Sequence, residues 1–193
     1  MIDGLIVISS GFAETGHVGR QRQRQLIGLA RSYGLRLVGP NCLGVINTAP
    51  EVSLNASLSP VMPPSGRVGF FCQSGALGIA ILADAATRGL GLSTFVSAGN
   101  RADVSGNDLL QYWHGDDRTE VVLLYLESFG NPRKFARLAR VLARTKPVIA
   151  VKSGGNATLL PTPGPHSKQI SEAAVASLFA QSGVIRTETL AAA

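Results

Sequence analysis

Residues 67–82, RVGFFCQSGALGIAIL, decide the fold class of this chain. A continuous apolar run at residues 68–71 is followed by a short polar turn at residues 73–75 and then by helix-forming residues. A strand that is apolar on both faces is typical of a parallel sheet covered by helices on two sides. The direct passage from strand to helix therefore predicts one β-α unit of an α/β fold.

The same alternation of apolar runs and helical patterns extends in both directions from this segment. Further strands are expected at residues 5–9, 36–38, 93–96, 121–126, 148–151 and 184–186. Helices are expected between them, at residues 20–32, 75–87, 107–113, 132–144 and 171–181. The fourth of these helices is strongly amphipathic, with Phe135, Ala139 and Leu142 on one side and a row of arginines on the other. We interpret that row as a solvated helix face.

The predicted elements divide the chain into two parts. Residues 48–66, TAPEVSLNASLSPVMPPSG, are rich in Pro and Ser, show neither helical nor strand periodicity, and are expected to form a linker. Residues 67–193 contain enough alternating elements for a flavodoxin-like doubly wound parallel sheet. Residues 1–47 contain only two strands and one helix, which cannot make a buried parallel sheet. We expect them to be the C-terminal end of a Rossmann domain, so that this chain is a fragment.

Composition excludes several classes of protein. With 193 residues, of which 45% are hydrophobic and 16% charged, the chain can bury a sizeable core and is not expected to be disordered. Its apolar runs are far shorter than the roughly 20 residues that cross a bilayer, and its N-terminus lacks the pattern of a secretory signal. Two cysteines without CxxC spacing indicate neither a disulfide framework nor a metal site. We expect a cytoplasmic protein with reduced thiols.

The net charge of +6 raises the question of an anionic partner. The arginines are dispersed, and aromatic residues do not alternate with them as a nucleic-acid stacking platform requires. An anionic small molecule or an acidic partner surface explains the charge without nucleic acid.

The turn at Ser74 is the clearest candidate for a binding site. Ser74 lies where an N-cap belongs, and the free N–H groups of Gly75, Ala76 and Leu77 would face a ligand at the carboxyl end of the strand. Such a helix N-terminus binds phosphate readily. One alternative is an ordinary capped helix. Another is the nucleophile elbow of a hydrolase, but the flanking glycines of G-x-S-x-G are missing.

Two further loops leave predicted strands at the same edge. Residues 39–47, GPNCLGVIN, form either a structural turn or a backbone that approaches a ligand closely. Residues 97–112 begin with a Gly-Asn turn and carry Asp103 and Asp108, which are more often caps or turn residues than catalysts.

Of the three histidines, we expect His17 and His114 to be exposed in polar turns. His166 lies in a Gly- and Pro-rich loop that follows the strand at residues 148–151. Parallel strands would bring this loop near Glu127 and the Ser74 turn. A histidine beside a carboxylate and an anion hole suits a phosphorylated histidine, because the carboxylate orients the imidazole and the N–H groups donate hydrogen bonds to the phosphoryl oxygens. An inert loop histidine remains the alternative.

The chain as a whole resembles the NDP-forming acyl-CoA synthetases of the succinyl-CoA synthetase superfamily, which include ADP-forming acetyl-CoA synthetase. The likeness is strongest to the version fused to a GNAT-type acetyltransferase. It is carried, in order along the chain, by the segments GFAETG (11–16), GPNCLGVIN (39–47), GRVGFFCQSGALG (66–78), GNRADVSGNDLLQYW (99–113), LLYLESFGNPRKFARLAR (123–140) and KPVIAVKSG (146–154).

This resemblance implies a function. Members of the family join a carboxylic acid to CoA at the expense of a nucleoside triphosphate, through an acyl phosphate and a phosphohistidine. A separate ATP-grasp domain or subunit, which binds ATP or ADP with Mg²⁺, exchanges the phosphoryl group with the nucleotide. The resemblance also implies that residues 1–47 belong to a CoA-binding Rossmann domain. Because the strands at residues 5–9 and 36–38 would lack their usual partner strands, we expect a homo-oligomer or a partner chain over that edge.

The resemblance also implies roles for individual residues. The segment Gln73, Ser74, Gly75 and Ala76 would hold the phosphohistidine, and Glu127 would orient it. Asn41 and Cys42 would lie near the CoA thiol, and His166 would carry the phosphoryl group.

The loop around His166 departs from the family pattern. Where relatives usually read SHTGALAG, this chain reads PHSKQIS at residues 165–171. A second hypothesis follows, in which the chain is a non-catalytic, acyl-CoA-responsive or interaction module that regulates a fused protein acetyltransferase.

Overall fold

The computed structural model describes residues 4–153 and 171–189. The elements along the chain are β1 (Gly4–Ile6), the 3-10 helix η1 (Ala13–Thr15), α1 (His17–Ser32), β2 (Arg36–Val38), β3 (Gly44–Asn47), β4 (Leu54–Ser57), β5 (Ser65–Cys72), α2 (Gly75–Thr87), β6 (Leu92–Ser97), α3 (Gly106–Gly115), β7 (Val121–Leu126), α4 (Pro132–Leu142), β8 (Val148–Lys152), α5 (Glu172–Ser182) and β9 (Ile185–Thr187). No helix in these two ranges is both long enough and apolar enough to cross a membrane.

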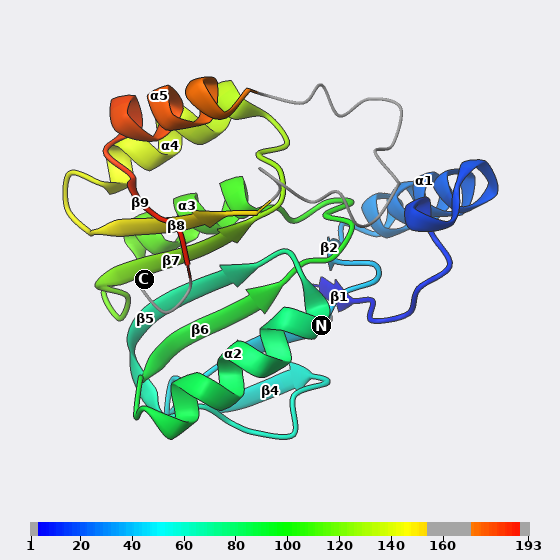
Figure 1. Cartoon of the computed structure of the whole chain (residues 1–193). Helices are drawn as coiled ribbons and strands as arrows, with labels where there is room; N and C mark the ends of the chain where they lie inside the picture. Colours follow the sequence, from blue (N-terminus) through cyan, green and yellow to red (C-terminus); the bar gives the residue numbers. More distant parts are fainter. Residues whose placement is uncertain (1–3, 154–170, 190–193) are drawn as a thin grey trace.

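The larger sheet confirms the predicted flavodoxin-like fold. Its strand order is β4-β3-β6-β5-β7-β8-β9. Five neighbouring strands in this order, β6, β5, β7, β8 and β9, are parallel to one another. Counted from β5 as the first strand, these five have the order 2-1-3-4-5 of flavodoxin-like domains. Figure 1 shows α2 on one face of the sheet and α3, α4 and α5 on the other, so both faces carry helices as the apolar strands predicted.

The strands β3 and β4 were not predicted. β3 pairs antiparallel with both β4 and β6, so residues 44–47 belong to the larger sheet, and β4 lies inside the stretch 48–66 that was expected to be a linker without strands. β4, with the sequence LNAS, is a half-exposed edge strand and therefore lacks an apolar pattern. The backbones of β3 and β4 approach so closely at Gly44, with φ 117°, that a Cβ there would lie 2.2 Å from the carbonyl oxygen of Ala56, so this position requires glycine. Only tertiary pairing makes these short segments into strands.

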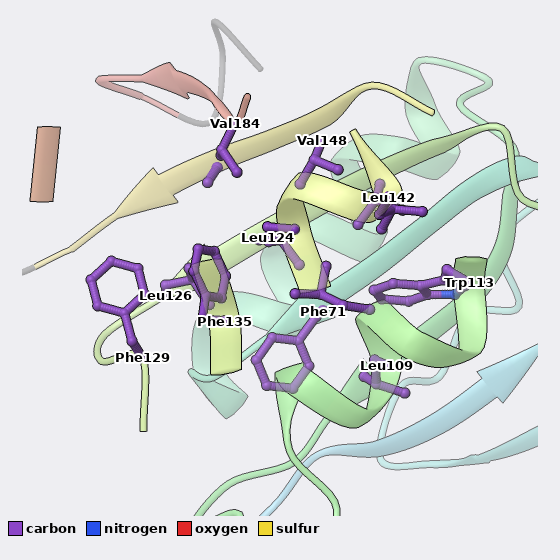
Figure 2. Packing of buried hydrophobic residues seen from close by; sticks show 14 of the residues in the cluster. Phe71, Leu109, Trp113, Leu124, Leu126, Phe129, Phe135, Leu142, Val148 and Val184 are labelled. Atoms are coloured by element: carbon purple, nitrogen blue, oxygen red, sulfur yellow. The ribbon is translucent and has the colours of Figure 1, made fainter. Parts of the chain in front are cut away.

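The main core lies between the sheet and α3, α4 and α5. Figure 2 shows side chains from β5, β7 and β8 meeting those of α3 and α4. The Trp113 indole is fully buried, donates from Nε1 to Thr94 Oγ1 at 2.8 Å, and packs so close to Gly69 that a Cβ there would lie 2.6 Å from the ring. Phe129 and Phe135 pack with ring centroids 5.0 Å apart. The predicted face of α4 is buried and its arginines are exposed, as expected.

The N-terminal segment forms a separate parallel pair. β1 pairs with β2, and α1 connects them. This β-α-β unit lies at the carboxyl end of the larger sheet (Figure 1). The loop after β6 joins the two sheets, because the Asp103 carboxylate accepts hydrogen bonds from Arg36 Nε at 2.8 Å, from the Leu37 N–H at 3.0 Å and from Arg31 Nη2 at 3.4 Å.

The charge of Asp103 matters for this junction. Burial raises the pKa of the Asp103 carboxyl, but the hydrogen bonds from Arg36 and the Leu37 N–H outweigh burial and bring the pKa below its usual value. Because folding lowers this pKa, the stabilising contribution is complete above the unfolded-state pKa of about 3.9. It is lost as the pH falls through the folded-state pKa.

We expect Asp103→Asn to lower the free energy of unfolding by about 1–3 kcal/mol at neutral pH, since it removes a charged acceptor shared by several donors. The difference from wild type, measured by urea denaturation, should narrow as the pH falls from about 5 to about 3. Asp84→Asn is the control, because Asp84 forms an exposed i,i+4 pair with Arg88 and should change stability by less than about 0.5 kcal/mol. Equal effects of the two substitutions would contradict the role of Asp103.

Candidate active site

Three loops meet at the carboxyl edge of the parallel strands. β5 lies between β6 and β7 in the sheet, so the residues that follow these strands are neighbours in space. They are Gln73 and Ser74 after β5, Arg101 beyond β6, and Glu127 with Ser128 after β7. In flavodoxin-like sheets this edge is where ligands bind.

Gln73 connects the first and third of these loops. Its side-chain Oε1 accepts hydrogen bonds from the N–H groups of Glu127 at 2.7 Å and Ser128 at 2.9 Å, and its Nε2 donates to the Ser128 carbonyl at 2.7 Å. Its backbone N–H donates to the Tyr125 carbonyl. Gln73 is buried, with 7% of its surface exposed. The structure thus places Gln73 differently from the expectation of a phosphate ligand, because these atoms are bound to the loop after β7.

The N-terminus of α2 has the free donors that the sequence predicted. No side chain caps the helix at Ser74. Among the described residues, none accepts a hydrogen bond from the N–H groups of Gly75 or Ala76. Gly75 is half-buried and Ala76 exposed, so both can be reached from solvent. These N–H groups carry the positive end of the helix dipole, which favours an anion.

Ser74 does not have the conformation of a nucleophile elbow. Its backbone, with φ −93° and ψ 124°, is ordinary extended backbone, whereas an elbow holds its serine in a strained turn. The geometry disfavours the hydrolase hypothesis.

Glu127 is exposed, and its carboxylate interacts electrostatically with Arg101 and Lys152. Burial lowers the pKa of Arg101, and the nearby Glu127 carboxylate opposes that effect. Burial likewise lowers the pKa of Lys152 at the end of β8, where the carboxylates of Glu172 and Glu127 oppose it. The Glu127 carboxylate is therefore close enough to interact with the charge of Arg101 beyond β6 and with that of Lys152 at the end of β8.

Cys72, the last residue of β5, is unsuited to nucleophilic chemistry. It is fully buried, and its Sγ donates to the Ser74 carbonyl at 3.1 Å. Burial, assisted by the charge of Glu127, raises the pKa of the Cys72 thiol to about 12. The thiol therefore remains protonated near neutral pH.

Arg101 is a site residue that the sequence analysis missed. Its Nη1 donates to the Ser128 carbonyl at 3.1 Å and its Nη2 to Ser128 Oγ at 2.7 Å. Its position a few residues after the strand at 93–96, directly behind a Gly-Asn turn, is a signal that could have identified it.

The loop at residues 39–43, which precedes β3, touches the loop after β6, but it brings only one of its two candidates to the surface. Asn41 is exposed, with φ 56°, and its Nδ2 donates to Asn100 Oδ1 at 3.4 Å. Cys42 is buried, and its Sγ donates inward to the Val7 carbonyl at 3.3 Å. Burial raises the pKa of the Cys42 thiol. The expectation that Cys42 lies close to the CoA thiol is therefore not supported for its side chain, which faces the protein interior.

Asn100 extends these contacts to the N-terminal segment. Its Nδ2 donates to Glu14 Oε2 at 2.5 Å and to Gln23 Oε1 at 2.9 Å. Glu14 Oε1 in turn accepts from the N–H groups of Gly11 at 2.5 Å and Phe12 at 3.0 Å. The segment GFAETG at residues 11–16 is thereby ordered against the loop after β6.

The expected exposure of His17 and His114 is confirmed, but their expected placement in polar turns is wrong, because His17 begins α1 and His114 lies in the last turn of α3. His166 lies outside the described residues, so its predicted approach to Glu127 stays a prediction. Within residues 4–153 and 171–189, no group of three or more His, Cys, Asp or Glu side chains is placed to hold a metal ion.

Comparison with known proteins identifies the larger sheet. Residues 65–193 match the family model described as the succinyl-CoA ligase like flavodoxin domain. The chain belongs to this family. The matched residues begin at β5, so the five parallel strands with their helices constitute this succinyl-CoA ligase-like domain.

Relatives extend the likeness over the rest of the chain. Acetate–CoA ligase (ADP-forming) I of Archaeoglobus fulgidus is 41% identical over 98% of this chain, and the alpha subunit of acetate–CoA ligase (ADP-forming) I of Pyrococcus furiosus is 37% identical over 95%. The chain spans only 28% and 40% of the lengths of these two relatives. The resemblance to ADP-forming acyl-CoA synthetases is thus confirmed, and the chain corresponds to their CoA-ligase, alpha-subunit-like region.

A solved structure agrees with these matches. The dinucleotide-forming acetyl-coenzyme A synthetase 1 of Candidatus Korarchaeum cryptofilum, in complex with phosphate and ADP, superimposes with a TM-score of 0.86 at 34% identity. The likeness covers 98% of this chain and 41% of that protein.

The burial of both thiols in this family member has a direct consequence. Because the thiolate is the reactive form and burial raises both pKa values, we expect neither Cys42 nor Cys72 to react with a disulfide reagent at about pH 8 in the folded protein. Both of the chain's 2 cysteines should react after unfolding in guanidinium. Spectrophotometric titration with Ellman's reagent measures this, and rapid labelling of a native thiol would contradict the assigned burial.

Proposed function

We propose that this chain is the CoA-ligase portion of an NDP-forming acyl-CoA synthetase, which converts a carboxylic acid, CoA and a nucleoside triphosphate into acyl-CoA, NDP and phosphate. Membership of the succinyl-CoA ligase-like family and the ADP-forming CoA ligases among the relatives support the proposal. The alternative is a regulatory module that controls a fused acetyltransferase, and the labelling experiment below distinguishes the two.

One observation of the structure carries the proposal. The hydrogen bonds of Gln73 hold the backbone of Glu127 directly beside the open N-terminus of α2. A phosphorylated imidazole needs both features, since the N–H groups of Gly75 and Ala76 would donate hydrogen bonds to the phosphoryl oxygens and the carboxylate would hold the opposite ring nitrogen in the required tautomer. His166 is our candidate for that imidazole.

The proposed reaction consists of two phosphoryl transfers followed by one acyl transfer. The terminal phosphoryl group of the nucleotide passes to a nitrogen of His166, and NDP is released. A carboxylate oxygen of the acid then takes this phosphoryl group, which gives an acyl phosphate and a free imidazole. Finally the CoA thiolate attacks the acyl carbon and phosphate leaves with the electrons of the C–O bond. The α2 N-terminus would stabilise the negative charge of the phosphoryl group.

The remaining components of the reaction lie outside this chain in our proposal. An ATP-grasp domain or subunit would bind ATP or ADP with Mg²⁺, which neutralises phosphate charge when bound. CoA would approach the exposed Asn41 loop together with a small carboxylic acid. We also propose a homo-oligomer, a cytoplasmic location where CoA and ATP are available, and a fused GNAT acetyltransferase domain.

A first prediction concerns the chain by itself. The purified 193-residue chain should form no thioester from acid, ATP and CoA, because in our proposal the nucleotide binds to a separate ATP-grasp domain or subunit. Addition of the ATP-grasp part, as a subunit or in the full-length protein, should produce acyl-CoA that is measurable by mass spectrometry. Thioester formation by the isolated chain would contradict this division of labour.

A second prediction concerns His166 in the full-length protein. Incubation with ATP labelled at the terminal phosphate should give a protein-bound label that is acid-labile and base-stable, and His166→Ala should abolish it. His114→Ala is the matched control, since His114 is exposed at the end of α3 and should leave labelling unchanged. Label that survives His166→Ala would remove His166 from the mechanism. A complete lack of label in the wild type would favour the regulatory module.

A further inference from the structure

We infer that Arg101 and Gln73 form a positioning clamp that holds Ser128 from two sides and thereby sets the direction of the adjacent Glu127 carboxylate. The catalytic consequence of this clamp rests on the proposed function, in which Glu127 orients a phosphohistidine. Neither Arg101 nor the side chain of Gln73 touches the reacting atoms in this view. They act through the loop that follows β7.

The N–H, the carbonyl and the hydroxyl of Ser128 all form hydrogen bonds with the two clamp residues. Its N–H donates to Gln73 Oε1, its carbonyl accepts from Gln73 Nε2 and Arg101 Nη1, and its hydroxyl bonds to Arg101 Nη2. The neighbouring N–H of Glu127 also donates to Gln73 Oε1, at 2.7 Å. The backbone on both sides of the Glu127 carbonyl is thus held, while the Glu127 residue stays exposed.

Arg101 makes these contacts at a cost. Its backbone has φ 53°, in the left-handed region that non-glycine residues rarely adopt. Its Nε is buried and has no hydrogen-bond partner among the described residues. Burial lowers the pKa of the guanidinium, and the nearby Glu127 carboxylate opposes that loss of charge. Strain and a buried cation at one residue are features that cluster at functional sites.

The topology explains why an arginine serves here. Arg101 follows β6 and Ser128 follows β7, and these strands are separated by β5 in the sheet. A long side chain is therefore needed to reach across the end of β5. The planar guanidinium can donate from two nitrogens at once, which fixes direction as well as distance. A lysine at this position would offer a single ammonium and a less defined geometry.

The functional test compares Arg101→Ala and Arg101→Lys with wild type in the full-length synthetase. We expect Arg101→Ala to lower kcat for thioester formation by about 10- to 100-fold, because a misplaced catalytic group costs about this much. KM for CoA should change by less than about threefold, since the clamp does not bind substrate. Arg101→Lys should be intermediate. Added guanidinium ion at millimolar concentration should restore part of the kcat of Arg101→Ala, which a loss of global stability would not allow.

Matched variants separate positioning from general effects. Arg88→Ala removes an exposed arginine that pairs with Asp84 on α2, and it should leave kcat unchanged and show no guanidinium response. Gln73→Leu removes the other half of the clamp, and it should lower kcat without rescue by guanidinium. A kcat for Arg101→Ala within about twofold of wild type would overturn the inference.

A structural readout keeps the clamp testable if no thioester forms in the wild-type protein, a result that would refute the proposed function alone. Hydrogen exchange, followed by mass spectrometry, reports the protection of the N–H groups of Glu127 and Ser128. In the full-length protein, Arg101→Ala and Gln73→Leu should each speed exchange of a peptide covering residues 124–131 by about tenfold or more, with α4 unchanged. Unaltered exchange in both variants would show that no clamp exists.

Discussion

The parallel pairing of β5 with both β6 and β7 is the constraint on which the rest of the structure depends. β5 is the central strand of the seven-stranded sheet, and its register places Cys72 opposite Ser97 on one side and Tyr125 on the other. The three strands therefore end at the same level of the sheet, and Gln73 and Arg101 both come within hydrogen-bond distance of Ser128. A shift of one residue in either pairing would turn the side chains of that strand to the opposite face and separate these loops.

Close packing on both faces keeps this register. Behind the sheet, the Trp113 indole lies against Gly69 of β5 and is anchored to Thr94 of β6, so one side chain of α3 contacts both strands. On the opposite face, Gly78 of α2 leaves room for Leu43 and Phe95, which a Cβ would approach within 2.9 and 3.1 Å. These contacts are satisfied at one register only, because interiors tolerate little change in volume.

The carboxyl edge of the sheet contains several features that lower the stability of the fold. The N-terminus of α2 has uncapped N–H groups, Arg101 has a buried Nε without a partner among the described residues, and its backbone is left-handed. Each of these lowers stability, and they occur together where the loops that follow β5, β6 and β7 meet. The N-terminal β-α-β unit packs against the same edge through Asp103 and Asn100, so both parts of the chain contribute to its shape.

The sequence by itself determined the α/β class, the parallel strands, every helix of the described region longer than one turn, and the turn at Ser74. These features depend on local periodicity and capping, which are written in neighbouring residues. The tertiary structure alone decided that β3 and β4 join the sheet, because such short strands exist only through their partners. It also decided that Cys42 faces inward, and that Gln73 and Arg101 bind Ser128. Those contacts join residues 27 or more positions apart, and no local pattern specifies which distant groups meet when strands pair.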